Sequence, residues 1–324
     1  MAIELIGAAG MTVELKQTYD RRLLMRAVTD TVFYREAPAK KSIPARGGKS
    51  IEFRRFEKIT ITGGSYTLTE GTAPTETQAT VSNVAATISQ YGQFSKISDL
   101  LEVQGFDPVI AEYVDLYGDA MGRGIDVVVR DGLSSATTLQ YAGASVRVGT
   151  SGTGAVGSGN YMSAAEILEF RRTLRRNGAK PINGYYKLLI HPDNTKDLFE
   201  DPDITDSFLH AADKGGANPM FTGVLGRWMG VEFIETNNLR VRSSYGMSGA
   251  DVYECIMFGQ EFYGITELSA MQARTIIHPR GTGGHTDPLE QYSTIGWKAA
   301  LATVLLNNDF GGIIYCASSR SNAS

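Results

Sequence analysis

Side chains that perform chemistry are scarce in this sequence. Its 324 residues include only four histidines and two cysteines. Cys255 and Cys316 belong to no CxxC pair or Cys/His run, so neither a disulfide framework nor a zinc site is expected. We expect both thiols to be reduced and buried. Because there is no HExxH pattern and no GxSxG elbow, the sequence predicts no catalytic residue, no metal and no cofactor.

A basic excess and a long apolar run are missing as well. The chain carries 31 Lys and Arg against 35 Asp and Glu, a formal net charge of −4. Dedicated nucleic-acid binders carry a basic surplus, so any contact with DNA is expected to be weak or local. The longest apolar run, residues 299–306, is far shorter than the roughly 20 residues that span a membrane. The N-terminus has no secretory pattern, which predicts a soluble protein made in a cytoplasm.

Alternation with a period of two begins at residue 51 and predicts a long two-stranded excursion. Its tip, residues 63–79, is rich in Gly, Thr, Pro and Glu, and its return strand, 80–95, is mostly small and polar. Such a ribbon is marginal alone in water. We find no matching apolar surplus elsewhere in the chain, so we expect contacts with a neighbouring subunit through Ile51, Phe53, Ile59, Ile61, Tyr66 and Leu68.

The strongest helical pattern follows this excursion. Asp107 is the predicted N-cap and Pro108 lies in the first turn, after which apolar residues recur at steps of three or four to about Leu133. The helix would span about 40 Å, which is more than the core of a 300-residue globule needs. Three glycines, at 118, 122 and 124, indicate a bend or close packing.

The middle of the chain reads as a mixed α/β domain. Ser163 and Glu166 form a capping box for a helix that ends at Asn177-Gly178. Strands are predicted at 185–190, 231–235 and 252–258, with a short helix at 192–199, and long strands follow at 275–278, 293–306 and 312–317. The capped helix carries four arginines that form either a solvated face or a contact with a subunit or nucleic acid: Arg171, Arg172, Arg175 and Arg176.

One glycine motif suggests an enzyme as an alternative. The run from Gly152 to Gly157 matches GxGxxG, the dinucleotide fingerprint. That motif needs a strand before it and a helix directly after it. Five residues separate the run from Ser163, and it lies in a wider Gly/Ser/Thr segment, so a linker is the favoured interpretation. A dinucleotide-binding oxidoreductase remains the alternative from a different class.

The order of these segments resembles the major capsid proteins of tailed bacteriophages with the Hong Kong 97-type fold. Residues 73–98 (APTETQATVSNVAATISQYGQFSKIS) are similar to the distal part of that family's extension loop. Residues 223–239 resemble a glycine, strand and asparagine-turn segment, and 293–306 resemble the terminal strand. Within the family, the N-four-like group is the most similar branch.

The resemblance implies an α+β fold in five parts. These are an N-terminal arm (1–48), an extension loop (49–98), a spine helix with the start of the peripheral domain (99–142), an axial α/β domain (143–264) and terminal strands that return to the peripheral domain (265–324).

The resemblance also implies a structural role rather than an enzymatic one. The chain would assemble as hexamers and pentamers into an icosahedral head around double-stranded DNA, in the virion after assembly in the host cytoplasm. Portal, scaffolding and decoration proteins would be further partners, and no membrane is involved. A bacterial encapsulin shell, which encloses enzymes instead of DNA, is the other alternative.

Overall fold

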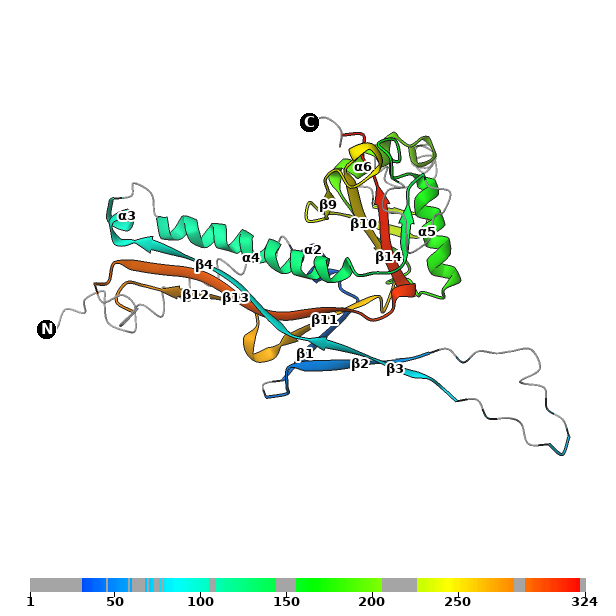
Figure 1. The fold of residues 1–324 in the computed structure, drawn as a ribbon, viewed down its shortest axis with the longest axis horizontal. Helices are drawn as coiled ribbons and strands as arrows, with labels where there is room; N and C mark the ends of the chain where they lie inside the picture. The colour runs from blue at the N-terminus through cyan, green and yellow to red at the C-terminus, as the bar shows by residue number, and fades with distance from the viewer. Residues whose placement is uncertain are drawn as a thin grey trace, which may run out of the picture.

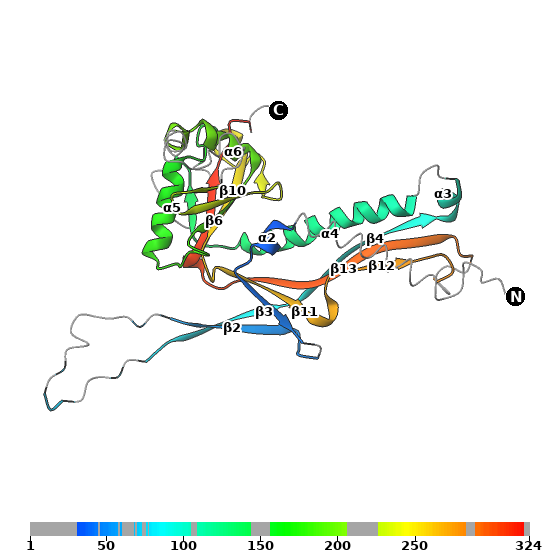
Figure 2. The same cartoon turned by 180° about the vertical axis from the view of Figure 1, so that it is seen from behind.

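In the computed structural model, an α/β unit sits at one end of a long sheet, and a hairpin projects from that sheet (Figures 1 and 2). The structure describes residues 31–44, 46–57, 78–104, 109–143, 156–205, 226–282 and 289–320, with positions 59, 68, 70–72 and 76.

The α/β unit is built on a seven-stranded sheet. Its path is β5-β14-β10-β6-β8-β7, and β9 pairs with β10 outside that path. The strands are β5 (Leu139–Tyr141), β6 (Tyr186–Ile190), β7 (Arg227–Trp228), β8 (Val231–Glu235), β9 (Val241–Arg242), β10 (Val252–Phe258) and β14 (Gly311–Cys316). Every residue of β10 and β14 is buried, which explains why both read as continuous apolar runs.

Two helices accompany this sheet, α5 (Ala164–Arg176) and α6 (Pro192–Glu200). The predicted start of α5 is confirmed, because Ser163 Oγ accepts the Glu166 N–H at 3.4 Å. The Glu166 carboxylate bonds elsewhere: it accepts from the Gln140 side chain at 2.5 Å and from the Gly143 N–H at 3.1 Å. This buried carboxylate therefore ties α5 to the end of β5.

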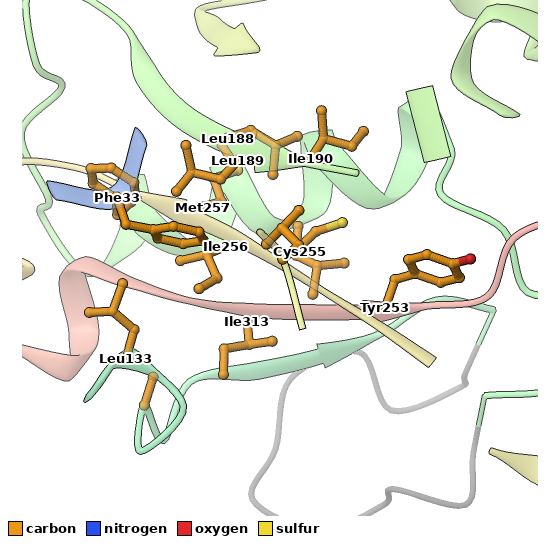
Figure 3. Packing of buried hydrophobic residues seen from close by; sticks show 14 of the residues in the cluster. Phe33, Leu133, Leu188, Leu189, Ile190, Tyr253, Cys255, Ile256, Met257 and Ile313 are labelled. Carbon is orange, nitrogen blue, oxygen red and sulfur yellow. The ribbon is translucent and has the colours of Figure 1, made fainter. Parts of the chain in front are cut away.

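The main hydrophobic cluster joins segments from the whole chain. Figure 3 shows side chains of β6, β10 and β14 meeting in it, with Phe33 from the N-terminal side and Leu133 from the end of the long helix. Cys255 and Cys316 are buried here as free thiols, as predicted, with their sulfur atoms 3.9 Å apart.

The second unit is a long sheet with a helix along one face (Figure 1). Its strands are β1 (Ala39–Ile43), β4 (Ser89–Ser98), β11 (Tyr263–Leu268), β12 (Arg274–His278) and β13 (Tyr292–Leu305). The 14-residue β13 is central, since it pairs with β4 along one edge and with β12 and β11 along the other. The short helices are α2 (Val32–Arg35) and α3 (Asp99–Gln104), and the 3-10 turns are η2 (Met247–Gly249), η3 (Ser269–Met271) and η5 (Asn308–Phe310).

The long helix α4 (Val109–Leu133) confirms the predicted long helix and its end at Leu133. The expected cap and first-turn proline, Asp107 and Pro108, lie outside the described residues. Close packing explains two of its glycines. A Cβ on Gly124 would lie 3.1 Å from the Trp297 ring, and one on Gly132 would lie 2.8 Å from Thr303 Cβ.

The predicted excursion is shorter than expected. β2 (Ser50–Phe56) and β3 (Val81–Thr87) form a two-stranded antiparallel ribbon, but the return strand divides at Ile88 and continues as β4 in the long sheet. The expectation that the chain offers no apolar surface to this ribbon is wrong. Its base packs on the long sheet in a second cluster formed by Ile43, Phe53, Ala86, Ile88, Ala300 and Ala302.

Candidate functional site

The far half of the hairpin carries exposed apolar side chains. Beyond the base that packs on the long sheet, Phe56 is 73% exposed, Ile59 54%, Leu68 73% and Val81 47%. The hairpin points away from the body of the molecule (Figure 1). Single exposed apolar residues are ordinary, but several on one projecting ribbon indicate a surface that another chain covers.

The predicted contact residues of the hairpin divide into two groups. Ile59 and Leu68 are exposed, whereas Phe53 is 6% exposed and Ile51 packs beside it on the second cluster. Phe53 as a neighbour-facing residue is therefore a wrong prediction: the alternation was correct, but this face lies on the chain's own Ala300 and Ala302. Ile61 and Tyr66 lie outside the described residues.

The four arginines lie in the second half of α5 in different surroundings. The Arg171 guanidinium lies over Gly230, where an added Cβ would come within 3.1 Å of Nη2. Arg172 forms an ion pair with Glu169. Arg175 and Arg176 are exposed in the last turn, where cations interact favourably with the helix dipole. Within the α/β unit, Arg171 and Arg172 thus have local contacts, and Arg175 also interacts with Tyr186.

The start of α5 argues against a dinucleotide site. A pyrophosphate would need free N–H groups at that helix end, but Asp201 Oδ2 accepts the Ala164 N–H at 2.8 Å and Ser163 accepts the Glu166 N–H. A carboxylate already occupies the position. Most of the run from Gly152 to Gly157 lies outside the described residues.

The described part of the chain shows neither a metal-binding cluster nor a membrane-spanning helix. Across the described ranges, no group of three or more His, Cys, Asp or Glu side chains could hold a metal ion. No helix there is long and apolar enough to cross a membrane.

Sequence reasoning missed a buried carboxylate at the junction of three segments. Asp126 of α4 is fully buried and accepts the Tyr34 N–H of α2 at 3.1 Å. It also accepts the Asn238 side-chain amide at 2.9 Å, and the Asn238 carbonyl accepts from Arg130 at 2.9 Å. Burial raises the pKa of Asp126, and the hydrogen bonds from Asn238 and the α2 backbone oppose this rise. An acidic residue on the apolar stripe of a helix was the available signal.

Replacing Asp126 with alanine should weaken the attachment of α2 to α4. The α2 N–H groups and the Asn238 amide would lose their acceptor, and each buried unsatisfied donor costs about 1–3 kcal/mol. We expect a loss of about 3 kcal/mol or more in the free energy of unfolding, measured with urea. Asp309→Ala is the control, because Asp309 is exposed and lies outside this junction, so its loss should be below about 1 kcal/mol. Equal effects of the two substitutions would contradict this role.

A second contact joins the same N-terminal segment to the α/β unit. Glu36 forms a largely buried ion pair with Lys187 of β6 and also binds Arg35. Burial acts to raise the pKa of Glu36, but hydrogen bonds from Lys187 and Arg35 outweigh it and lower the pKa below its ordinary value of 4.5. The folded state therefore favours the ionised carboxylate.

Acid should weaken this contact in a defined direction. Because the folded pKa is depressed, the stabilisation is complete above the ordinary value and is lost as the pH falls through the lower, folded one. In Glu36→Gln, the free energy of unfolding should fall less between pH 6 and pH 3 than in the unsubstituted chain. The exposed Glu290→Gln is the control and should keep the original slope; a steeper slope in Glu36→Gln would refute the assignment.

A family model for phage capsid protein matches residues 82–315, which include α4, the strands of the long sheet other than β1, and nearly all of the α/β unit. The chain belongs to this phage capsid protein family. It is a structural capsid protein, as the sequence analysis predicted.

Solved phage capsids show the same fold at low sequence identity. The capsid of Ralstonia phage GP4 superimposes with a TM-score of 0.64 at 15% identity, covering 88% of both chains. The capsid of Helicobacter pylori bacteriophage KHP30 gives 0.66 at 11% identity, covering 86% of this chain and 87% of that one. The Cyanophage Pam1 capsid gives 0.63 at 14% identity, covering 85% and 86%. No curated protein matches the chain.

These comparisons confirm the predicted α+β, Hong Kong 97-type fold. They also bear on the exposed hairpin. A capsid protein acts through its contacts with other copies, and its functional site is therefore the surface that those copies cover.

Proposed function

We propose that this capsid protein forms the icosahedral head of a tailed bacteriophage, as hexamers and pentamers around double-stranded DNA. The observation that carries the proposal is the projecting hairpin, whose base is fixed on its own sheet while Phe56, Ile59 and Leu68 stay exposed. A ribbon of this kind gains stability when a neighbour buries it.

The shape of the subunit supports closed rings. The hairpin and the tip formed by α3 lie at opposite ends of the molecule (Figures 1 and 2). A contact between such unlike surfaces is heterologous, and it closes into rings when the rotation between subunits permits. We further propose the five parts given above, 1–48, 49–98, 99–142, 143–264 and 265–324. Within the second part, the described ribbon is formed by β2 and β3.

The net charge of the chain supports a shell protein that encloses DNA rather than a sequence-specific DNA-binding protein. With a net charge of −4, the subunit would hold packaged DNA without tight or sequence-specific binding. Portal and scaffolding proteins, and decoration proteins where present, would be the further partners in a virion assembled in the host cytoplasm. No enzymatic step is part of the proposal. The exposed Arg175 and Arg176 are candidates for subunit or DNA contacts.

The direct test is assembly of the purified chain. We expect size-exclusion chromatography to show a megadalton species, made with a scaffold if one is needed, and electron microscopy to show icosahedral particles. The isolated subunit should bind DNA with little dependence on salt. A chain that stays monomeric under all assembly conditions, or binds DNA with a steep salt slope, would overturn the proposal.

A further inference from the structure

The only two cysteines of the sequence meet in the central sheet of the α/β unit. The antiparallel register of β10 and β14 places Cys255 opposite Ile314 and Cys316 opposite Tyr253. Residues two apart on a strand point to the same face, so the two thiols are diagonal neighbours on one face of the sheet. Both side chains are fully buried, and their sulfur atoms lie 3.9 Å apart. Figure 3 shows Cys255 inside the main hydrophobic cluster.

Little movement separates this contact from a covalent bond. The sulfur atoms of a disulfide lie about 2.05 Å apart, so the two sulfurs would need to approach by about 2 Å. Rotation about the Cα–Cβ bond of either cysteine moves its sulfur without moving the backbone. The other sulfur contacts are long: the Cys255 thiol donates to Asn194 Oδ1 at 3.9 Å, and the Cys316 thiol donates to the Tyr253 carbonyl at 4.0 Å. These weak bonds would yield to a disulfide.

The surroundings favour a slow and lasting bond over a fast redox switch. The hydrogen bond with Cys255, and then burial, raise the pKa of the Cys316 thiol, and the acidic Asp197 and Glu166 act in the same direction. Thiolate is the reactive form of cysteine, so the folded chain should react slowly. A disulfide at this buried position would also be shielded from external thiols.

The position of the pair in the fold makes a bond consequential. After β10 the chain leaves the α/β unit, forms β11, β12 and β13 of the long sheet, and returns as β14. A disulfide between Cys255 and Cys316 would close this excursion at its root, across 61 positions of sequence. Closing a long loop reduces the conformational freedom of the unfolded chain and thereby stabilises the folded one.

We propose that Cys255 and Cys316 form a modification site, which becomes a disulfide within the subunit when the chain leaves the reducing cytoplasm and meets a peroxide. Cytoplasmic thiols are kept reduced, so the subunit folds and assembles with both thiols free. The timing rests on the proposed shell function, whereas the bond itself does not.

Hydrogen peroxide is small enough to reach a buried thiol through brief local opening, and the chemistry balances. One thiolate attacks a peroxide oxygen, the O–O bond breaks, and a sulfenic acid and hydroxide form. The second thiol then attacks that sulfur, the S–O bond breaks, and water leaves with the thiol proton. Overall, two thiols and one hydrogen peroxide give one disulfide and two waters.

Thiol counting on the purified chain tests the bond. The folded chain is treated with dilute hydrogen peroxide, unfolded, alkylated and analysed by mass spectrometry without reduction. We expect the free thiols to fall from two to none, with a single linked peptide pair containing Cys255 and Cys316. The urea midpoint of the linked chain should rise by at least about 0.5 M over the reduced chain. Two free thiols after treatment, links between copies only, or a midpoint that does not rise would each overturn the proposal.

Cys316→Ala is the matched control. The same treatment should give no linked peptide within the chain and no rise in the urea midpoint, and it measures the separate effect of oxidising the ten methionines. A similar rise in this variant would show that the disulfide is not its cause, and would overturn the proposal.

Assembled particles test the timing. Particles alkylated at the moment of cell lysis should carry both thiols, and peroxide-treated particles should carry none. Particles already linked at lysis, or still reduced after treatment, would contradict the proposed timing. Absence of particles from the unsubstituted chain would instead refute the shell function, while the result on the purified chain would still decide the bond.

Discussion

A subunit in which a short Gly-Ser turn replaces residues 63–79 is expected to fold normally and to form no shell. The hairpin base stays on the long sheet through Phe53 and Ala86, and the main hydrophobic cluster, as described, contains no residue of 63–79. The removed segment contains Tyr66 and Leu68, which the sequence assigns to a contact with a neighbouring subunit. Circular dichroism and urea unfolding should therefore match the full chain, while electron microscopy shows no particles.

A second variant separates the effect of the length of the segment from the effect of its side-chain contacts. It keeps the length of 63–79 but permutes the residues so that Tyr66 and Leu68 move to the two ends of the segment. If specific contacts matter, this variant should also fail to assemble. Normal particles from the shortened chain would refute the extension-loop assignment, and normal particles from the permuted chain alone would reduce the role of the segment to a spacer.

Gly312→Ala should be among the most damaging single substitutions in this chain. A Cβ at this position would lie 2.0 Å from the Thr138 carbonyl oxygen, which is backbone and cannot rotate away. Gly312 lies in β14, between β5 and β10, so relief requires two strands of the central sheet to separate. We expect a loss of at least about 3 kcal/mol in the free energy of unfolding, or failure to fold.

Gly159→Ala is the matched control for that substitution. A Cβ on Gly159 would meet no atom within 4 Å, and its φ is not positive. The expected change in unfolding free energy is within about 0.5 kcal/mol. A loss of stability for Gly159→Ala comparable to that for Gly312→Ala would show that backbone freedom, and not the approach of Thr138, decides the effect.

Elements with a regular local pattern could be predicted from sequence. The helical stripe that ends at Leu133, the Ser163 cap and the apolar runs of β8 and β10 all match the structure. Each of these signals lies within one stretch of chain, where side-chain periodicity directly reports which face is buried.

Contacts between distant segments could not be predicted in this way. The hairpin base meets residues far along the chain, as the bond from Arg55 to the Leu306 carbonyl shows across 251 positions. On β13, the hairpin base packs against Ala300 and Ala302. These side chains are small, so the sequence pattern did not identify them as a packing surface for Phe53. Phe53 was therefore assigned to a neighbour although its partner is in the same chain. The Asp126 junction was missed for the same reason, because Tyr34 and Asn238 are remote from it in sequence.

The placement of β13 and β14 has a consequence for how the protein is made. β13 joins β4, β11 and β12 into one sheet, and β14 joins β5 to β10 in the other. On the ribosome, residues 292–316 emerge after every other described strand, so neither sheet can close while the earlier segments are being synthesised. Completion of both sheets is thus delayed until residues 292–316 have been made, and a partly translated chain cannot yet present a finished surface to its neighbours on the same messenger RNA.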